Sequence, residues 1–147
     1  SAADREALLA GLADGTITVI ASDHAPHTDF EKDVEFDHAP FGITGLETQL
    51  ALALMQLYHS GRMGLSQLIA RFTSGPASVL KLESKGTLKN GADGDVTVFD
   101  PDVRWVFERG DTASKAFNSP FYGWRLRGRA VMTIVGGRVV WPDDGPR

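Results

Sequence analysis

The sequence has no cysteine among its 147 residues. This absence excludes a disulfide-stabilised scaffold and every metal site built on thiolates, so histidine and carboxylate side chains are the strong metal ligands that remain. The sequence also has no run that approaches the roughly 20 apolar residues of a membrane-spanning helix. We therefore expect a protein without a membrane segment, and the cytoplasm is the simplest compartment for it.

Charge of one sign is not concentrated anywhere in the chain. Lys and Arg number 15 against 19 Asp and Glu, which gives a net charge of −4. Without a basic block there is no indication of a nucleic-acid partner. Because 42% of the residues are hydrophobic and 23% are charged, the composition is that of a globular domain with its own core.

The first third of the chain has the pattern of a βα unit. Apolar spacing predicts a helix over residues 3–13, which Asp14 and Gly15 end. Residues 16–21 are almost all apolar or β-branched, which is typical of a parallel strand buried on both faces. The sequence holds no second strand of this kind, so we expect the neighbours of this strand to come from protein outside these 147 residues.

A loop of more than twenty residues follows and leads to helices. Thr44 and Glu47 have the spacing of a capping box, with Thr44 as the N-cap of a helix that runs to about Ser60. Two shorter helices are predicted over residues 65–72 and 77–82. Connections as long as residues 22–45 are usually functional in a compact domain.

The pattern changes near residue 83 from helical periodicity to short β runs separated by turn residues. We predict two parts, residues 1–82 with the loop 22–45, and residues 83–147 as a small β module. The expected strands are residues 96–99, 105–107, 124–126, 131–135 and 138–141. Gly136 and Gly137 predict a tight hairpin, and residues 142–147 have the composition of a frayed end.

The residues best suited to chemistry lie where the predicted strand ends. Asp23, His24 and His27 place one carboxylate and two imidazoles within five residues. The carboxyl ends of strands carry the active sites of βα barrels, and a carboxylate there can bind a metal, move a proton, or do both. A catalytic or binding site is favoured over a turn in which Asp23 acts only as a cap.

Other interpretations of this loop remain open from the residues alone. Asp23, His24, His27 and His38 could form an independent zinc site without cysteine. In the turn at residues 39–43, Phe41 and Gly42 could contact a ligand or only anchor the loop. The charged residues 31–35 have the pattern of a solvated, mobile lid.

Several motifs together resemble the C-terminal part of bacterial class I dihydroorotases, which belong to the metal-dependent amidohydrolase superfamily. The resemblance covers nearly the whole chain. It is carried by Asp23-His24-Ala25-Pro26-His27, Glu31-Lys32, Ala39-Pro40-Phe41-Gly42-Ile43, Gly45-Leu46-Glu47-Thr48, Lys85-Gly86-Thr87-Leu88, Gly91-Ala92-Asp93, Asp95-Val96, Asn118-Ser119-Pro120-Phe121 and Thr133-Ile134-Val135-Gly136-Gly137.

The resemblance implies a role for each matching residue. Asp23 would be the catalytic acid and base and also a metal ligand, while His27 would contact the substrate carboxylate. Phe41 and Gly42 would add substrate contacts through the backbone. The implied reaction interconverts dihydroorotate and N-carbamoyl-aspartate in pyrimidine biosynthesis, with a binuclear zinc centre as cofactor.

The resemblance also implies a larger enzyme, because the other zinc ligands of the family have no counterpart in this sequence. The implied fold class is α/β, as the last strand and helices of a (β/α)₈ barrel followed by a small β module. The chain alone would then be inactive and would associate with the preceding part of the barrel. A homo-oligomeric enzyme is possible from the sequence. The alternatives are a related hydantoinase or allantoinase, and a non-catalytic scaffold subunit.

Overall fold

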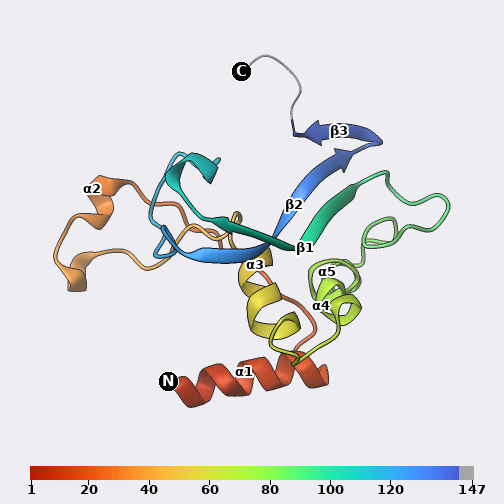
Figure 1. The fold of residues 1–147 in the computed structure, drawn as a ribbon, viewed down its shortest axis with the longest axis horizontal. Helices are drawn as coiled ribbons and strands as arrows, with labels where there is room; N and C mark the ends of the chain where they lie inside the picture. Colours follow the sequence, from red (N-terminus) through yellow and green to blue (C-terminus); the bar gives the residue numbers. More distant parts are fainter. Residues whose placement is uncertain (143–147) are drawn as a thin grey trace.

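The computed structural model describes residues 1–142, so all but the first residue of the expected frayed end lies outside the described residues. The fold is α/β, with short helices packed beside a small antiparallel sheet (Figure 1). Within residues 1–142, no helix is both long enough and apolar enough to cross a membrane.

The N-terminal helix confirms the helix predicted over residues 3–13. Helix α1 spans Ala2–Asp14, and Ser1 caps it by accepting a hydrogen bond from the backbone N–H of Asp4 at 3.3 Å. The helix ends at Gly15, whose φ of 92° is a left-handed conformation that glycine adopts without steric cost. Leu9 and Leu12 pack against the buried cluster that contains Leu54 and Leu57. Helix α1 lies along the base of the helical region in Figure 1.

Residues 16–21 do not form the predicted strand. They pair with no strand in the described part of the chain, and their backbone bonds go to helices instead. The N–H of Ile17 donates to Gly11 at 2.8 Å, and the N–H of Ile20 donates to Arg71 at 3.0 Å. A strand exists only as part of a ladder, so a segment with strand composition but no neighbouring strand stays unassigned.

The helix predicted after Thr44 begins later than its sequence signal. Helix α3 spans Gln49–Ala53 and continues as the π-helical turn η2, Leu54–Tyr58. The predicted capping box is wrong, because residues 46–48 form a turn and the Glu47 carboxylate accepts from the distant N–H of Ala113 at 3.1 Å. A contact across 66 residues of sequence thus replaces the local cap.

The two following helices are close to their predictions. Helix α4 spans Leu65–Phe72, as the apolar spacing predicted. Helix α5 spans Ser74–Val79, about three residues earlier than expected at both ends. The main core forms where α4 meets η2, and its buried members are Leu54, Leu57, Met63 and Leu68.

The β module is a three-stranded antiparallel sheet in the order β1-β2-β3. Strand β1 spans Val96–Val106, β2 spans Arg125–Val135, and β3 spans Arg138–Trp141. The predicted hairpin between β2 and β3 is confirmed. The four shorter strands predicted before the hairpin merge in pairs into β1 and β2. In β1 the stretch between Asp100 and Arg104 is a shift in strand register within one strand and not a turn between two.

The sheet is joined to the helices by a second apolar cluster of Ala51, Phe107 and Leu126, all buried. Strand β2 also passes close to η2. A Cβ at Gly128 would lie 2.3 Å from Cδ1 of Leu54, and the φ of Gly128 is 95°. Only glycine fits this crossing, which sets how closely the sheet approaches the helices.

Candidate functional site

The segment of residues 22–45 is a closed excursion from the body of the molecule. It carries the short helix α2, Asp29–Lys32, and the 3₁₀ turn η1, Phe36–His38. Figure 1 shows α2 projecting to the side of the helical region. At its base the N–H of Ala25 donates to the carbonyl of Ile43 at 3.0 Å, so the outgoing and returning limbs meet there. We call this segment the site loop.

Asp23 lies at the start of the site loop, where the unpaired residues 16–21 end. Its φ of 43° is left-handed, which is uncommon outside glycine although aspartate and asparagine adopt it more readily than most residues. The residue is exposed, and within residues 1–142 its carboxylate forms no hydrogen bond or ion pair. Strained backbone of this kind concentrates at functional sites.

The His24 ring binds the backbone of the site loop. Its Nδ1 accepts hydrogen bonds from the backbone N–H groups of Gly45 at 3.1 Å and Leu46 at 3.3 Å. A ring nitrogen that accepts hydrogen bonds carries no proton, so Nδ1 is the acceptor nitrogen of this ring. The bond partners are N–H groups rather than the backbone carbonyl that a buried histidine commonly binds.

His27 is held on both its backbone and its ring. Its Nε2 lies 2.9 Å from the carbonyl oxygen of Phe41, and Nδ1 lies 3.8 Å from a carboxylate oxygen of Glu31. Because a carbonyl only accepts, Nε2 carries the proton in the Phe41 bond. A substrate carboxylate could therefore reach only Nδ1 without breaking that bond, and the role of His27 stays a prediction.

Phe41 and Gly42 form the tip of the returning limb. The Phe41 side chain is 98% exposed, so it is not part of the core of residues 1–142. Gly42 has a φ of 111°, and a Cβ there would lie 2.6 Å from the Cβ of Ala25. The glycine is thus required by backbone conformation and by the close approach of the outgoing limb.

Lys32 departs from the solvated, mobile lid that was expected at residues 31–35. Lys32 is half-buried, and its Nζ donates to the carbonyls of Pro40 at 2.6 Å and Gly42 at 2.8 Å. Glu31 caps α2, and the Thr28 backbone N–H that it binds lowers the pKa of its carboxyl group. Spacing could have suggested the Glu31 cap, but nothing local to Lys32 indicated its two carbonyl partners.

A further residue of this region carried no site prediction from sequence. The side chain of Asn118 binds three backbone groups of the site loop, at Ala25, His27 and Gly42. These partners lie 76 to 93 residues away in the sequence. The resemblance included Asn118 in a motif but gave it no role, and no spacing rule links residues so far apart.

The residues described do not form a metal site by themselves. No three His, Asp or Glu side chains in residues 1–142 lie close enough together to hold a metal ion. His38, which the independent zinc site would need, has a side chain that is 74% exposed and that pairs, among residues 1–142, only with Glu35 at 3.6 Å. This arrangement argues against an independent zinc site in residues 1–142. Asp23 is then the one predicted metal ligand in the site loop.

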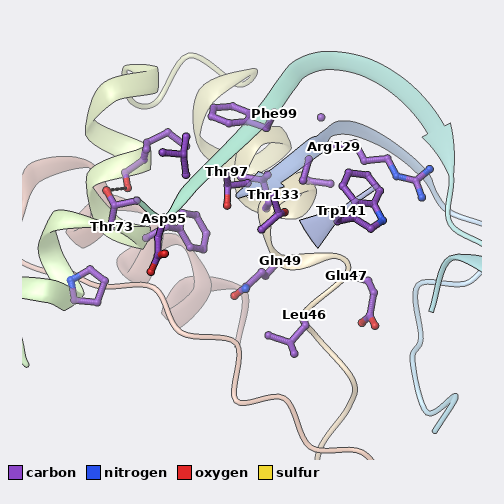
Figure 2. A pocket seen from close by; sticks show the side chains of 18 of the residues that line it. Leu46, Glu47, Gln49, Thr73, Asp95, Thr97, Phe99, Arg129, Thr133 and Trp141 are labelled. Atoms are coloured by element: carbon purple, nitrogen blue, oxygen red, sulfur yellow. Dashed lines mark hydrogen bonds between the residues drawn. The ribbon is translucent and has the colours of Figure 1, made fainter. Parts of the chain in front are cut away.

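A broad groove of about 1460 Å³ lies between the helices and the sheet, and it is separate from the site loop tip. Figure 2 shows Thr97, Phe99 and Thr133 of the sheet on one side of it and Leu46 and Gln49 on another. Asp23, His27 and Gly42 are not among its lining residues. Large apolar side chains on its walls are exposed, namely Leu80, Leu82, Leu88 and Trp141.

The helices, the sheet and the loop that starts at Asp23 together match a known class of proteins. Residues 1–140 match the amidohydrolase family, and the chain belongs to that family. The L-hydantoinase (dihydropyrimidinase) from Arthrobacter aurescens is similar in structure, with a TM-score of 0.80, 32% identity, and coverage of 90% of this chain and 30% of that one. A D-hydantoinase from Bacillus sp. AR9 has a TM-score of 0.84 at 26% identity, covering 92% of this chain and 31% of that one.

Curated relatives define the likeness more narrowly. The chain is 56% identical over 141 residues to a dihydroorotase of Geobacter sp. (strain M21), a match that covers 96% of this chain and 33% of that protein. It is 51% identical over 138 residues to a dihydroorotase of Endomicrobium trichonymphae, with coverage of 94% and 33%. The resemblance seen in the sequence is therefore confirmed, and the chain spans about a third of the length of these relatives.

Proposed function

We propose that this chain supplies one wall of the active site of a dihydroorotase, which interconverts dihydroorotate and N-carbamoyl-aspartate in the cytoplasm. The observation that carries the proposal is the 56% identity to a protein of that name across 96% of the chain. The site loop agrees with it, because Asp23 is exposed with a carboxylate that has no partner in residues 1–142. The remaining groups of the site would come from the two thirds of the relatives that lie outside the match.

The proposed fold is the C-terminal part of a (β/α)₈ barrel in residues 1–82, followed by a β module in residues 83–147. Residues 16–21 would be the last barrel strand, and their lack of a strand partner in the described chain supports this. The groove and its exposed walls would be covered by the same outside protein. A chain without that cover is expected to associate with it or with itself.

Asp23 would move the proton in the proposed reaction. It takes a proton from the attacking water and returns it to the ring nitrogen as the carbon–nitrogen bond breaks. A binuclear zinc centre, when bound by the complete enzyme, would make water nucleophilic and polarise the amide carbonyl. Asp23 is the one residue here that would join that centre, since the described residues do not form it alone.

The other loop residues would bind the substrate. His27 would donate from Nδ1 to the substrate carboxylate, which needs a ring protonated on both nitrogens because Nε2 already donates to Phe41. Phe41 and Gly42 would form the rim over the ring, held in place by the Lys32 bonds to the carbonyls of Pro40 and Gly42. Binding and proton transfer would thus be divided between the loop tip and Asp23.

A chimera tests this function. It joins the part of the Geobacter dihydroorotase outside the match to this chain in place of its own C-terminal third. We expect zinc-dependent hydrolysis of dihydroorotate by the chimera at a rate comparable to the parent Geobacter enzyme. A folded, zinc-loaded chimera that hydrolyses hydantoin and not dihydroorotate would favour the hydantoinase alternative, and one without either activity would favour a scaffold.

A further inference from the structure

Asn118 connects the β module to both limbs of the site loop. Its Oδ1 accepts from the backbone N–H of His27 at 3.1 Å, and its Nδ2 donates to the carbonyls of Ala25 at 2.9 Å and Gly42 at 3.3 Å. The backbone carbonyl of Asn118 also accepts from the N–H of Thr44 at 3.2 Å. Two of these partners lie on the outgoing limb and two on the returning limb.

The side-chain chemistry fits this position. A primary amide offers an acceptor and two donors in one plane, so it can hold an N–H and two carbonyls at once. Aspartate would keep the bond from His27 but would place its second oxygen against the carbonyls of Ala25 and Gly42. Serine or alanine would leave partly buried backbone groups without partners, which is costly.

The Asn118 bonds act on the same backbone that carries the proposed substrate contacts. Gly42 receives bonds from Asn118 and also from Lys32. Its neighbour Phe41 holds the ring of His27 through Nε2. Asn118 therefore fixes the distance between the backbone of His27 and the loop tip, although within residues 1–142 it forms no hydrogen bond with Asp23 or Phe41.

We propose that Asn118 is a positioning residue that holds both limbs of the site loop in the geometry that binds substrate. The catalytic half of this inference rests on the proposed function. The structural half does not, because it concerns only the loop backbone. A residue of the β module thereby controls substrate affinity at a loop that begins 96 residues earlier in the chain.

Hydrogen–deuterium exchange on the full-length chimera tests the structural half. Asn118→Ala should raise the exchange rate of peptides covering residues 24–46 at least about tenfold, because all three side-chain hydrogen bonds to the loop are lost. Asn118→Asp should do the same for the Ala25 and Gly42 contacts while it retains the His27 bond. Asn90→Ala is the matched control, because Asn90 is the other asparagine, is exposed, and should leave this exchange unchanged.

Steady-state kinetics on the same variants test the catalytic half. We expect KM for dihydroorotate to rise about tenfold in Asn118→Ala while kcat stays within about threefold, because the loop binds and Asp23 moves the proton. Faster exchange with an unchanged KM would overturn the proposal, as would unchanged exchange in both Asn118 variants. If Asn118→Ala does not fold, Asn118→Asp decides. An unsubstituted chimera without dihydroorotase activity overturns the proposed function, and the exchange data still decide whether Asn118 holds the loop.

Discussion

Gly42→Ala changes the site loop at the point where its two limbs come closest. The added Cβ would lie 2.6 Å from the Cβ of Ala25, at least 0.8 Å short of ordinary contact. The φ of 111° is also outside the range that alanine adopts without strain. Alanine at this position must therefore either overlap Ala25 or move the backbone.

The cost can be worked out for both responses. Keeping the native backbone costs about 1–2 kcal/mol for the left-handed conformation and about 1–3 kcal/mol for the overlap. Moving the backbone instead breaks the bonds from Lys32 and Asn118 to the Gly42 carbonyl, at about 1 kcal/mol each. Since the cheaper response prevails, we expect the closed loop to lose about 2 kcal/mol.

Hydrogen–deuterium exchange on the chimera measures this loss. A change of about 2 kcal/mol should speed exchange of residues 24–46 roughly thirtyfold. Gly123→Ala is the matched control, because its φ of 81° is also positive but no atom lies within 4 Å of the added Cβ. Adding Ala25→Gly to Gly42→Ala removes the overlap and leaves the backbone strain, so it should recover about half of the effect.

Two results would refute this reasoning. If Gly42→Ala speeds exchange of residues 24–46 no more than Gly123→Ala speeds exchange around residue 123, the two limbs do not approach each other as closely as described. If Ala25→Gly recovers nothing in the Gly42→Ala background, the cost comes from the backbone alone. KM for dihydroorotate should rise together with the exchange rate, because the same tip carries the proposed substrate contacts.

The remaining predictions concern the packing, the ion cluster and the histidine of the loop. Gly128→Ala should destabilise the protein by about 2–4 kcal/mol by chemical denaturation, because its Cβ would overlap Leu54, whereas Gly61→Ala, with open space and φ 76°, should cost about 1 kcal/mol. Hydrogen bonds to Asp93 and Asp95 raise the pKa of Lys85 from 10.5 to about 12, and the Lys85 ammonium lowers the pKa of Asp95 below 3.8. The Lys85 contribution is complete below pH 10.5 and is lost as the pH rises through about 12, while the Asp95 contribution is complete above pH 3.8 and is lost as the pH falls through its lower folded pKa. The protection of the β2–β3 hairpin amides against hydrogen exchange should therefore be constant between about pH 5 and 9 and should fall below pH 3.8. Protection that falls between about pH 5 and 9 would contradict this expectation. His27→Ala should raise KM for dihydroorotate about tenfold with a smaller change in kcat, and an unchanged KM would remove His27 from the binding site.

Much of the secondary structure follows from local sequence. The helix over residues 65–72 was predicted to its end residues, because its apolar positions repeat at helical spacing and its ends lie at Gly64 and Thr73. The hairpin at Gly136 and Gly137 was predicted from turn chemistry alone. In these places the interactions that decide the structure lie within a few residues of one another.

The failures occur where distant contacts decide. Thr44 and Glu47 have the spacing of a cap, but Asn118 binds the Thr44 N–H and Ala113 binds the Glu47 carboxylate. Residues 16–21 are a different case, because their strand partners were already expected outside these 147 residues, and the described chain offers none.

The candidate site shows the same division. Asp23, His27, Phe41 and Gly42 could be proposed because they lie close together in sequence and resemble a family motif. Lys32 was misjudged from its charged neighbours, and Asn118 was given no role, since the bonds of each depend on the folded path of the loop. Local pattern therefore indicates which residues carry chemistry, and the fold decides which residues hold them in place.

Asp23→Asn in the chimera tests the central claim most directly. Asparagine adopts left-handed φ values as readily as aspartate, so the strained backbone at φ 43° should be retained. We expect kcat for dihydroorotate to fall at least about a thousandfold with an unchanged thermal midpoint, because the group that moves the proton is lost. A folded Asp23→Asn chimera with kcat within tenfold of the unsubstituted protein would contradict the account.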